Sequence, residues 1–87
     1  MAVYLRATKT GLVKLLRSHG YDVPSIRSAC FQQFRGMAWL GWLDSSGNQR
    51  KATLVAAAGR PIFWVDRSPV EELSMAEIIR YGLCEEK

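Results

Sequence analysis

Residues 12–31, LVKLLRSHGYDVPSIRSACF, are the stretch from which we predict the fold. The first half repeats inward positions at the i, i+3, i+4 and i+7 spacing of an amphipathic helix. This stripe consists of Leu12, Leu15, Leu16 and His19. Gly20 follows directly, and glycine adopts the left-handed dihedral angles after a helix without steric cost. The first half therefore predicts a helix that ends at Gly20.

The second half has the pattern of another short helix. Pro24 suits a first helical turn, because the N–H that proline lacks has no partner there. The inward positions of this segment are Ile26, Ala29, Cys30 and Phe34, and the outward polar positions are Ser25, Ser28, Gln32 and Arg35. We expect a helix over residues 24–35 that ends at Gly36, while a strand over the same residues stays open as an alternative.

A short motif spans the two predicted helices. Its positions are a glycine at the turn, an apolar residue after it, a hydroxyl residue before a β-branched one, and a small residue three further on: Gly20, Tyr21, Ser25, Ile26 and Ala29. Over residues 12–31 this motif resembles the helix-turn-helix of small phage-type repressors such as the Cro proteins. The resemblance implies a dimeric DNA-binding protein that regulates transcription on a phage or another mobile element.

The same resemblance implies a set of DNA contacts. Residues on the outward stripe of the second helix would face the major groove, because arginine and glutamine make bidentate contacts with guanine and adenine. Basic residues elsewhere would anchor the phosphates. The expected DNA-binding residues are Lys14, Arg17, Ser25, Arg27, Ser28, Gln32, Arg35, Arg50 and Lys51.

The charge distribution fits a phosphate-facing surface with an acidic far side. Residues 1–60 hold nine Lys or Arg and only two acidic residues, whereas residues 61–87 hold three basic and six acidic residues. An ordinary solvated surface with an acidic C-terminal helix explains the same separation equally well.

The segments on either side of the central stretch complete an α+β fold. Residues 2–7 alternate like a short strand, and Thr8 or Thr10 is placed to cap the first helix. Residues 37–57 read as a β-hairpin with a turn at residues 44–48, and a second turn at residues 58–61 leads to a third strand, IFWVD. We expect one domain over residues 1–87, with a short strand, two helices, a three-stranded antiparallel meander and a C-terminal helix.

The C-terminal helix has two candidate starts. Ser68 with Glu71 and Ser74 with Glu77 both match the capping-box spacing, and Pro69 suits the first helical position. Gly82 marks the expected end of this helix.

Large apolar side chains fall on both faces of the predicted meander. Trp39 and Trp42 are three residues apart, and Phe63 and Trp64 are adjacent, so each pair points to opposite sides of a regular strand. Short helices cover one face, so we expect the other to meet a second protomer or another protein, unless a bulge or a helix hides it.

This pattern supports a second hypothesis about function. A non-enzymatic inhibitor or adaptor, for example a phage-encoded inhibitor of a host system, would use the aromatic sheet and a basic face to bind an acidic protein. Its expected interface residues are Trp39, Trp42, Phe63 and Trp64. A third alternative, binding of single-stranded nucleic acid by stacking on these rings, would require arginines on the aromatic face.

The sequence predicts neither an enzyme nor a metal or cofactor site. His19 is the only imidazole, and Cys30 and Cys84 lie far apart, so neither a catalytic set nor a zinc site is expected. The stretch GLVKLLRSHGY also resembles the opening of mRNA-cleaving toxins of the HicA type, but their catalytic histidine has no counterpart in residues 27–31. We expect a cytoplasmic protein, because no long apolar run and no signal-peptide pattern is present.

Overall fold

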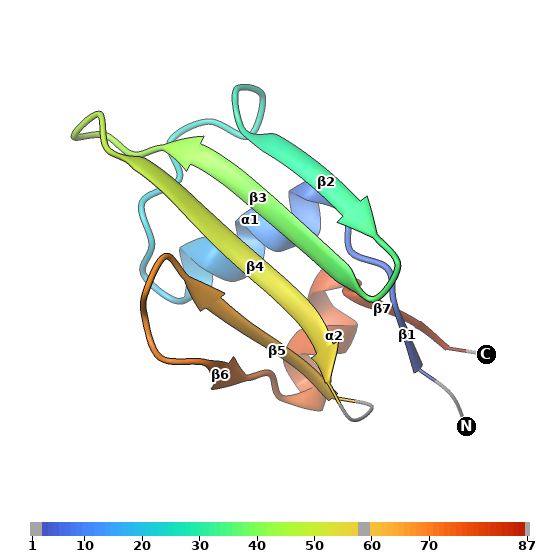
Figure 1. Cartoon of the computed structure of the whole chain (residues 1–87). Coiled ribbons are helices and arrows are strands. Elements are labelled where there is room, and N and C mark those ends of the chain that lie inside the picture. The colour runs from blue at the N-terminus through green and yellow to red at the C-terminus, as the bar shows by residue number, and fades with distance from the viewer. Residues whose placement is uncertain (1–2, 58–59, 87) are drawn as a thin grey trace.

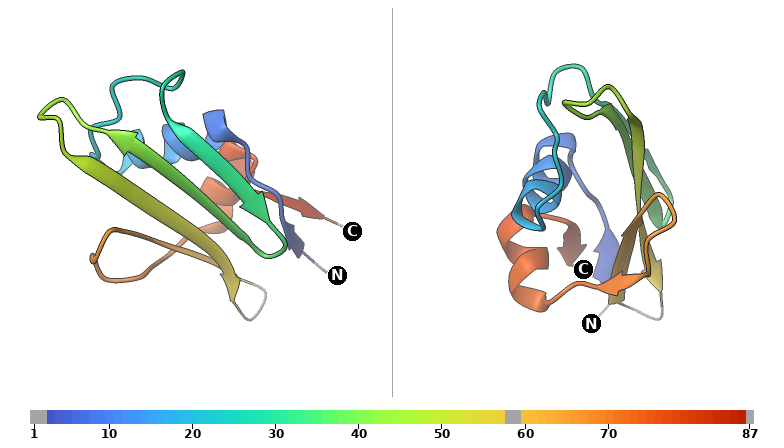
Figure 2. Two further views of the ribbon diagram at one scale, coloured as in Figure 1. Left: turned by 45° about the horizontal axis from the view of Figure 1, so that its top comes forward. Right: turned by 90° about the vertical axis from the view of Figure 1, so that its left-hand side faces the viewer.

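The computed structural model describes residues 3–57 and 60–86, which form a helix layer packed on one face of an antiparallel sheet. The elements are β1 (Val3–Leu5), α1 (Lys9–Ser18), β2 (Cys30–Phe34), β3 (Met37–Leu43), β4 (Gln49–Ala57), β5 (Arg60–Val65), β6 (Glu71–Glu72), α2 (Met75–Tyr81) and β7 (Cys84–Glu86). Strands β2 to β6 form a five-stranded sheet in chain order, and β1 pairs with β7. Figure 1 and the right-hand view of Figure 2 show α1, α2, β1 and β7 all on the same side of this sheet.

Helix α1 forms as the sequence predicts. Thr8 is the N-cap, and its side-chain oxygen accepts a hydrogen bond from the Gly11 N–H at 3.1 Å. The three leucines of the predicted stripe are fully buried, and Gly20 adopts the expected positive φ of 88°. His19 lies at the C-cap, where its ring packs edge-on against the buried Phe63 and 25% of its side chain stays exposed.

The second predicted helix is absent. Residues 21–29 form a loop with a single turn at residues 26–28, where Ser25 Oγ accepts a hydrogen bond from the Ser28 N–H. The Ala29 N–H closes this turn on Ile26 O at 3.3 Å, and the chain continues as a strand from residue 30. Residues 30–34 then form β2, because pairing with β3 supplies backbone partners and the Gln33 side chain bonds Ala7 N and Phe34 O. The helix-turn-helix and its three-stranded meander are therefore wrong as a fold prediction, and Cys30, expected inside, is exposed.

The three strands expected after Gly36 are present as part of the larger sheet. Strands β3, β4 and β5 pair consecutively in antiparallel fashion. The turn at residues 44–48 is held by Asp44 Oδ1, which accepts hydrogen bonds from the N–H groups of Ser46 and Asn48. The bond from Asn48 is the main cause that lowers the pKa of Asp44. The second predicted turn includes residues 58–59, which lie outside the described residues.

Helix α2 begins at the second of the two candidate starts. Ser74 and Glu77 form the reciprocal capping box, and Gly82 ends the helix with a φ of 61°. The earlier candidate start is wrong. Ser68 Oγ instead accepts a hydrogen bond from the Val65 N–H, and Glu71 belongs to the short strand β6.

The core lies between the helix layer and the inner face of the sheet. Its fully buried large side chains are Leu12, Val13, Leu15, Leu16, Leu40, Leu54, Phe63, Val65 and Leu83. Burying one such side chain stabilises the fold by about 1.5–3 kcal/mol. Helix α1 buries Leu12, Val13, Leu15 and Leu16 on this inner face, and α2 buries Ile78. Both helices lie on the same side of the sheet, so neither covers its other face.

Candidate functional site: the uncovered sheet face

The face of the sheet that points away from α1 and α2 is the candidate site, and we call it the outer face. Its described residues alternate with the buried positions along each strand. They are Cys30, Gln32, Phe34, Met37, Trp39, Gly41, Leu43, Gln49, Lys51, Thr53, Val55, Ile62, Trp64 and Glu72. In Figure 1 this face is turned toward the viewer, with the helices behind it.

Two cross-strand rows of the outer face hold most of its large apolar side chains. The strand register aligns Gln32, Trp39, Thr53 and Trp64 in one row, and Phe34, Met37, Val55 and Ile62 in the next. Directly opposed side chains on a sheet lie about 4.5–5.5 Å apart and contact each other. Phe34 keeps 49% of its surface exposed and Leu43 keeps 62%, so the face combines half-buried aromatic rings with exposed apolar groups.

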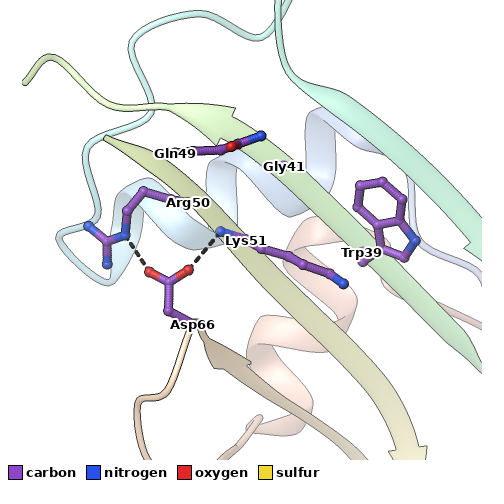
Figure 3. A pocket seen from close by; sticks show the side chains of 6 residues that line it. All are labelled: Trp39, Gly41, Gln49, Arg50, Lys51 and Asp66. Atoms are coloured by element: carbon purple, nitrogen blue, oxygen red, sulfur yellow. Dashed lines mark hydrogen bonds and ion pairs between the residues drawn. The ribbon is translucent and has the colours of Figure 1, made fainter. Parts of the chain in front are cut away.

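A hollow of about 330 Å³ opens on this face beside Trp39 (Figure 3). It is lined by Trp39, Gly41, Gln49, Arg50, Lys51 and Asp66. A Cβ atom on Gly41 would lie 3.5 Å from the Trp39 ring, so the missing side chain of this glycine makes the space. The hollow is large enough for one side chain of a partner.

The charged groups at the hollow differ in whether they form an ion pair. Arg50 and Asp66 pair with each other, whereas Lys51 lies over the Trp39 ring. Arg50 Nε bonds Asp66 Oδ2 at 2.5 Å, and this hydrogen bond raises the pKa of Arg50 above its ordinary value. Asp66 Oδ1 also accepts the Lys51 N–H at 3.0 Å, which fixes the end of β5 against β4. The Lys51 ammonium instead lies 5.2 Å from the centre of the Trp39 ring, and no carboxylate of the described residues forms an ion pair with it. Lys51 is therefore the charged group at the hollow that no described carboxylate neutralises.

The predicted DNA-binding residues do not share one surface. Lys14 and Arg17 are exposed on α1, in the helix layer, where Arg17 donates two hydrogen bonds to Val23 O. Ser25, Arg27 and Ser28 lie in the loop before β2. The remaining four occur on or beside the sheet: Gln32 and Lys51 on the outer face, Arg35 in the β2–β3 turn, and Arg50 paired with Asp66. No described helix presents the stripe that was assigned to the major groove.

The predicted protein-interface residues divide between the two faces. Trp39 and Trp64 are half-buried on the outer face, whereas Trp42 and Phe63 are buried in the core. The Trp42 indole N–H donates to Asp22 O at 2.8 Å, so the polar group of this buried ring has a hydrogen-bond partner. The predicted interface did not include the second row, which consists of Phe34, Met37, Val55 and Ile62, or Gly41 at the hollow. Period-two alternation in β4 and β5 would have indicated Val55 and Ile62.

His19 belongs to a contact between the two helices. Its Nε2 lies 2.6 Å from Glu77 Oε2, its Nδ1 lies 3.9 Å from Glu71 Oε2, and its ring meets Phe63 edge-on at 5.0 Å. The hydrogen bond with His19 is the main cause that lowers the pKa of Glu77. The arrangement ties the C-terminal end of α1 to the N-terminal end of α2.

Comparison of the chain with protein-family models, with curated proteins and with solved structures finds no match. Among residues 3–57 and 60–86 no group of three or more His, Cys, Asp or Glu side chains is placed to hold a metal ion. None of the described helices is long and apolar enough to cross a membrane.

Proposed function

We propose that this protein is a non-enzymatic binding protein that docks on another protein through the outer face of its sheet. The observation that carries the proposal is the pair of apolar cross-strand rows on a face that neither helix covers. Contiguous apolar patches that are exposed on a folded domain typically mark interaction sites.

The chemistry of the outer face favours a particular kind of partner surface. Aromatic side chains are common anchors at the centre of protein interfaces, and Trp39 and Trp64 lie in the same row. The Lys51 ammonium beside the hollow suits an acidic side chain of the partner. We therefore expect a mainly apolar partner surface with a carboxylate opposite Lys51.

Nucleic acid fits the described outer face less well. Stacking proteins combine aromatic platforms with a basic groove that follows the phosphates. Among the outer-face side chains that the structure describes, Lys51 is the one cation, and Glu72 carries the opposite charge. Duplex recognition by a groove-reading helix loses its support together with the second predicted helix.

The proposal is tested by affinity capture from a lysate of the native cells. The immobilised baits are the wild-type chain, Trp39→Thr, Trp64→Thr and a control, Ile79→Gln. Threonine keeps the strand propensity of the two outer positions. The control removes an apolar group that is more exposed than either tryptophan, because Ile79 on α2 keeps 74% of its surface exposed and both rings are half-buried.

We expect the wild type and the Ile79→Gln control to capture the same proteins, and both tryptophan variants to lose them. Capture that is equal with all four baits would contradict the proposal. A single-stranded oligonucleotide that binds the wild type but not Trp39→Thr would replace it with the nucleic-acid alternative.

A further inference from the structure

The two edges of the five-stranded sheet differ in how well they are protected against pairing with a further strand. The β6 edge is only two residues long, and both are glutamates, which discourages the addition of another strand. The β2 edge is five residues long, CFQQF, and contains no charged residue and no proline. In the described part of the chain β2 pairs with β3 alone. The usual protection of an exposed edge is therefore missing at β2.

The register of the β2–β3 hairpin determines which backbone groups face this open edge. A two-residue turn at Arg35 and Gly36 joins the strands, so the closing pair Phe34–Met37 is a hydrogen-bonded pair. Hydrogen-bonded and non-hydrogen-bonded pairs alternate along an antiparallel ladder. The backbone N–H and C=O groups of Gln32 therefore bond to Trp39. Those of Phe31 and Gln33 point to the open edge.

We propose that two copies of this chain pair antiparallel through β2, about a two-fold axis at Gln32. Phe31 then lies opposite Gln33 of the partner subunit, and these two symmetric pairs exchange four backbone hydrogen bonds. Gln32 lies opposite its own copy as a non-hydrogen-bonded pair, with a Cα–Cα distance of about 4.5 Å. In this register each β2 residue lies on the same face of the combined sheet as it does in the single chain.

Two features of β2 favour its pairing with a second copy of itself. Self-pairing of an uncharged strand places no like charges opposite each other, so the symmetric contact costs no repulsion. The strand is also held in place before it pairs, because the Gln33 side chain bonds Ala7 N at 2.9 Å and Phe34 O at 2.8 Å. The pairing does not depend on the proposed function of the outer face.

Charge substitutions at Gln32 test the symmetric register. Gln32 is exposed, so Gln32→Lys and Gln32→Glu leave the monomer fold intact. Sedimentation velocity over a range of protein concentrations should show a wild-type dimer. Each variant alone should dissociate about fivefold more readily, which corresponds to about 1 kcal/mol of like-charge repulsion across the axis.

An equal mixture of the two Gln32 variants should recover the wild-type affinity, because lysine then faces glutamate. A monomeric wild type at every concentration would overturn the proposal. Two single variants that dimerise as tightly as the wild type would also overturn it, because the dimer would then use another surface.

Disulfide cross-linking provides an independent measure of the register. In the triple variant Cys30→Ser, Cys84→Ser, Gln32→Cys, the thiols at position 32 of the two chains meet at a distance that suits a disulfide. Mild oxidation should join two chains. The matched control Cys30→Ser, Cys84→Ser, Gln49→Cys carries an exposed thiol on β4 and should form the same noncovalent dimer without a cross-link under the same conditions. Equal cross-linking of both variants, or none at position 32, would contradict the proposed pairing.

Discussion

Gly11 in α1 lies so close to the backbone of Tyr81 in α2 that a Cβ atom on Gly11 would be 2.2 Å from the Tyr81 carbonyl oxygen. Close approach of the two helices therefore requires glycine at this position. We expect Gly11→Ala to lower the free energy of unfolding by about 1–3 kcal/mol, the usual cost of overpacking, although alanine favours helices. Urea denaturation measures this change.

The control for Gly11→Ala is Thr10→Ala, which changes an exposed neighbour in the same turn. It should alter the stability by less than about 0.5 kcal/mol, as surface substitutions usually do. Equal stabilities of Gly11→Ala and the wild type would show that the helices can separate at little cost.

Filling the hollow beside Trp39 should weaken the binding of the partner without lowering the free energy of unfolding. A Cβ atom on Gly41 would make ordinary contacts, 3.5 Å from the Trp39 ring and 3.8 Å from Arg50 O. Gly41→Val should therefore leave the stability unchanged or raise it by up to about 1 kcal/mol, because valine favours strands. The same variant should bind the partner more weakly, since its side chain occupies the hollow.

The measurement for Gly41→Val is thermal unfolding combined with the affinity capture described above. Undiminished capture by a stable Gly41→Val variant would mean that the partner does not enter the hollow. Gly41→Ala, which fills less of the space, should lie between the wild type and the valine variant.

Acid should weaken the contact between the helices. The hydrogen bond with His19 holds the folded-state pKa of Glu77 below its ordinary value of 4.5. The contribution of this carboxylate is therefore complete above about pH 4.5 and is lost as the pH falls through the lowered folded-state value. We expect Glu77→Gln to show a shallower loss of unfolding free energy than the wild type below pH 4.5.

Glutamine keeps the capping box of α2, so Glu77→Gln removes the charge and preserves the helix start. Urea titrations at several acid pH values measure the difference. A residual slope is expected in the variant, because backbone hydrogen bonding also lowers the pKa of Asp44. Identical slopes for variant and wild type would show that the His19–Glu77 bond contributes nothing to acid stability.

Duplex DNA should be bound only by electrostatic attraction between basic side chains and the phosphates, without recognition of the base sequence. Arg27 lies in the loop before β2 and Arg35 in the turn after it, so they do not form one groove-reading surface. We expect any affinity for duplex DNA to fall steeply with salt and to be the same for unrelated sequences. Fluorescence anisotropy at low and moderate salt measures both properties. A preferred sequence that remains bound at moderate salt would restore the regulator hypothesis.

Local sequence patterns predicted both helices and their ends, but they left two candidate starts for each: Thr8 or Thr10 for α1, and Ser68 or Ser74 for α2. Thr8, the leucine stripe and Gly20 set the limits of α1, and Ser74, Glu77 and Gly82 set those of α2. The turn at residues 44–48 forms for the same reason, since the Asp44 carboxylate bonds the backbone within the turn. Caps and tight turns are satisfied by residues a few positions away, so a sequence contains all their partners.

Residues 24–35 show where local patterns fail. Their apolar spacing fits a helix, but β2 forms because β3 supplies its backbone hydrogen bonds and Gln33 bonds Ala7, 26 positions earlier in the chain. The outer face depends on tertiary structure in the same way. Alternation in the sequence separates Trp39 from Trp42, but only the packing of both helices on one side of the sheet decides which tryptophan is buried and which stays available to a partner.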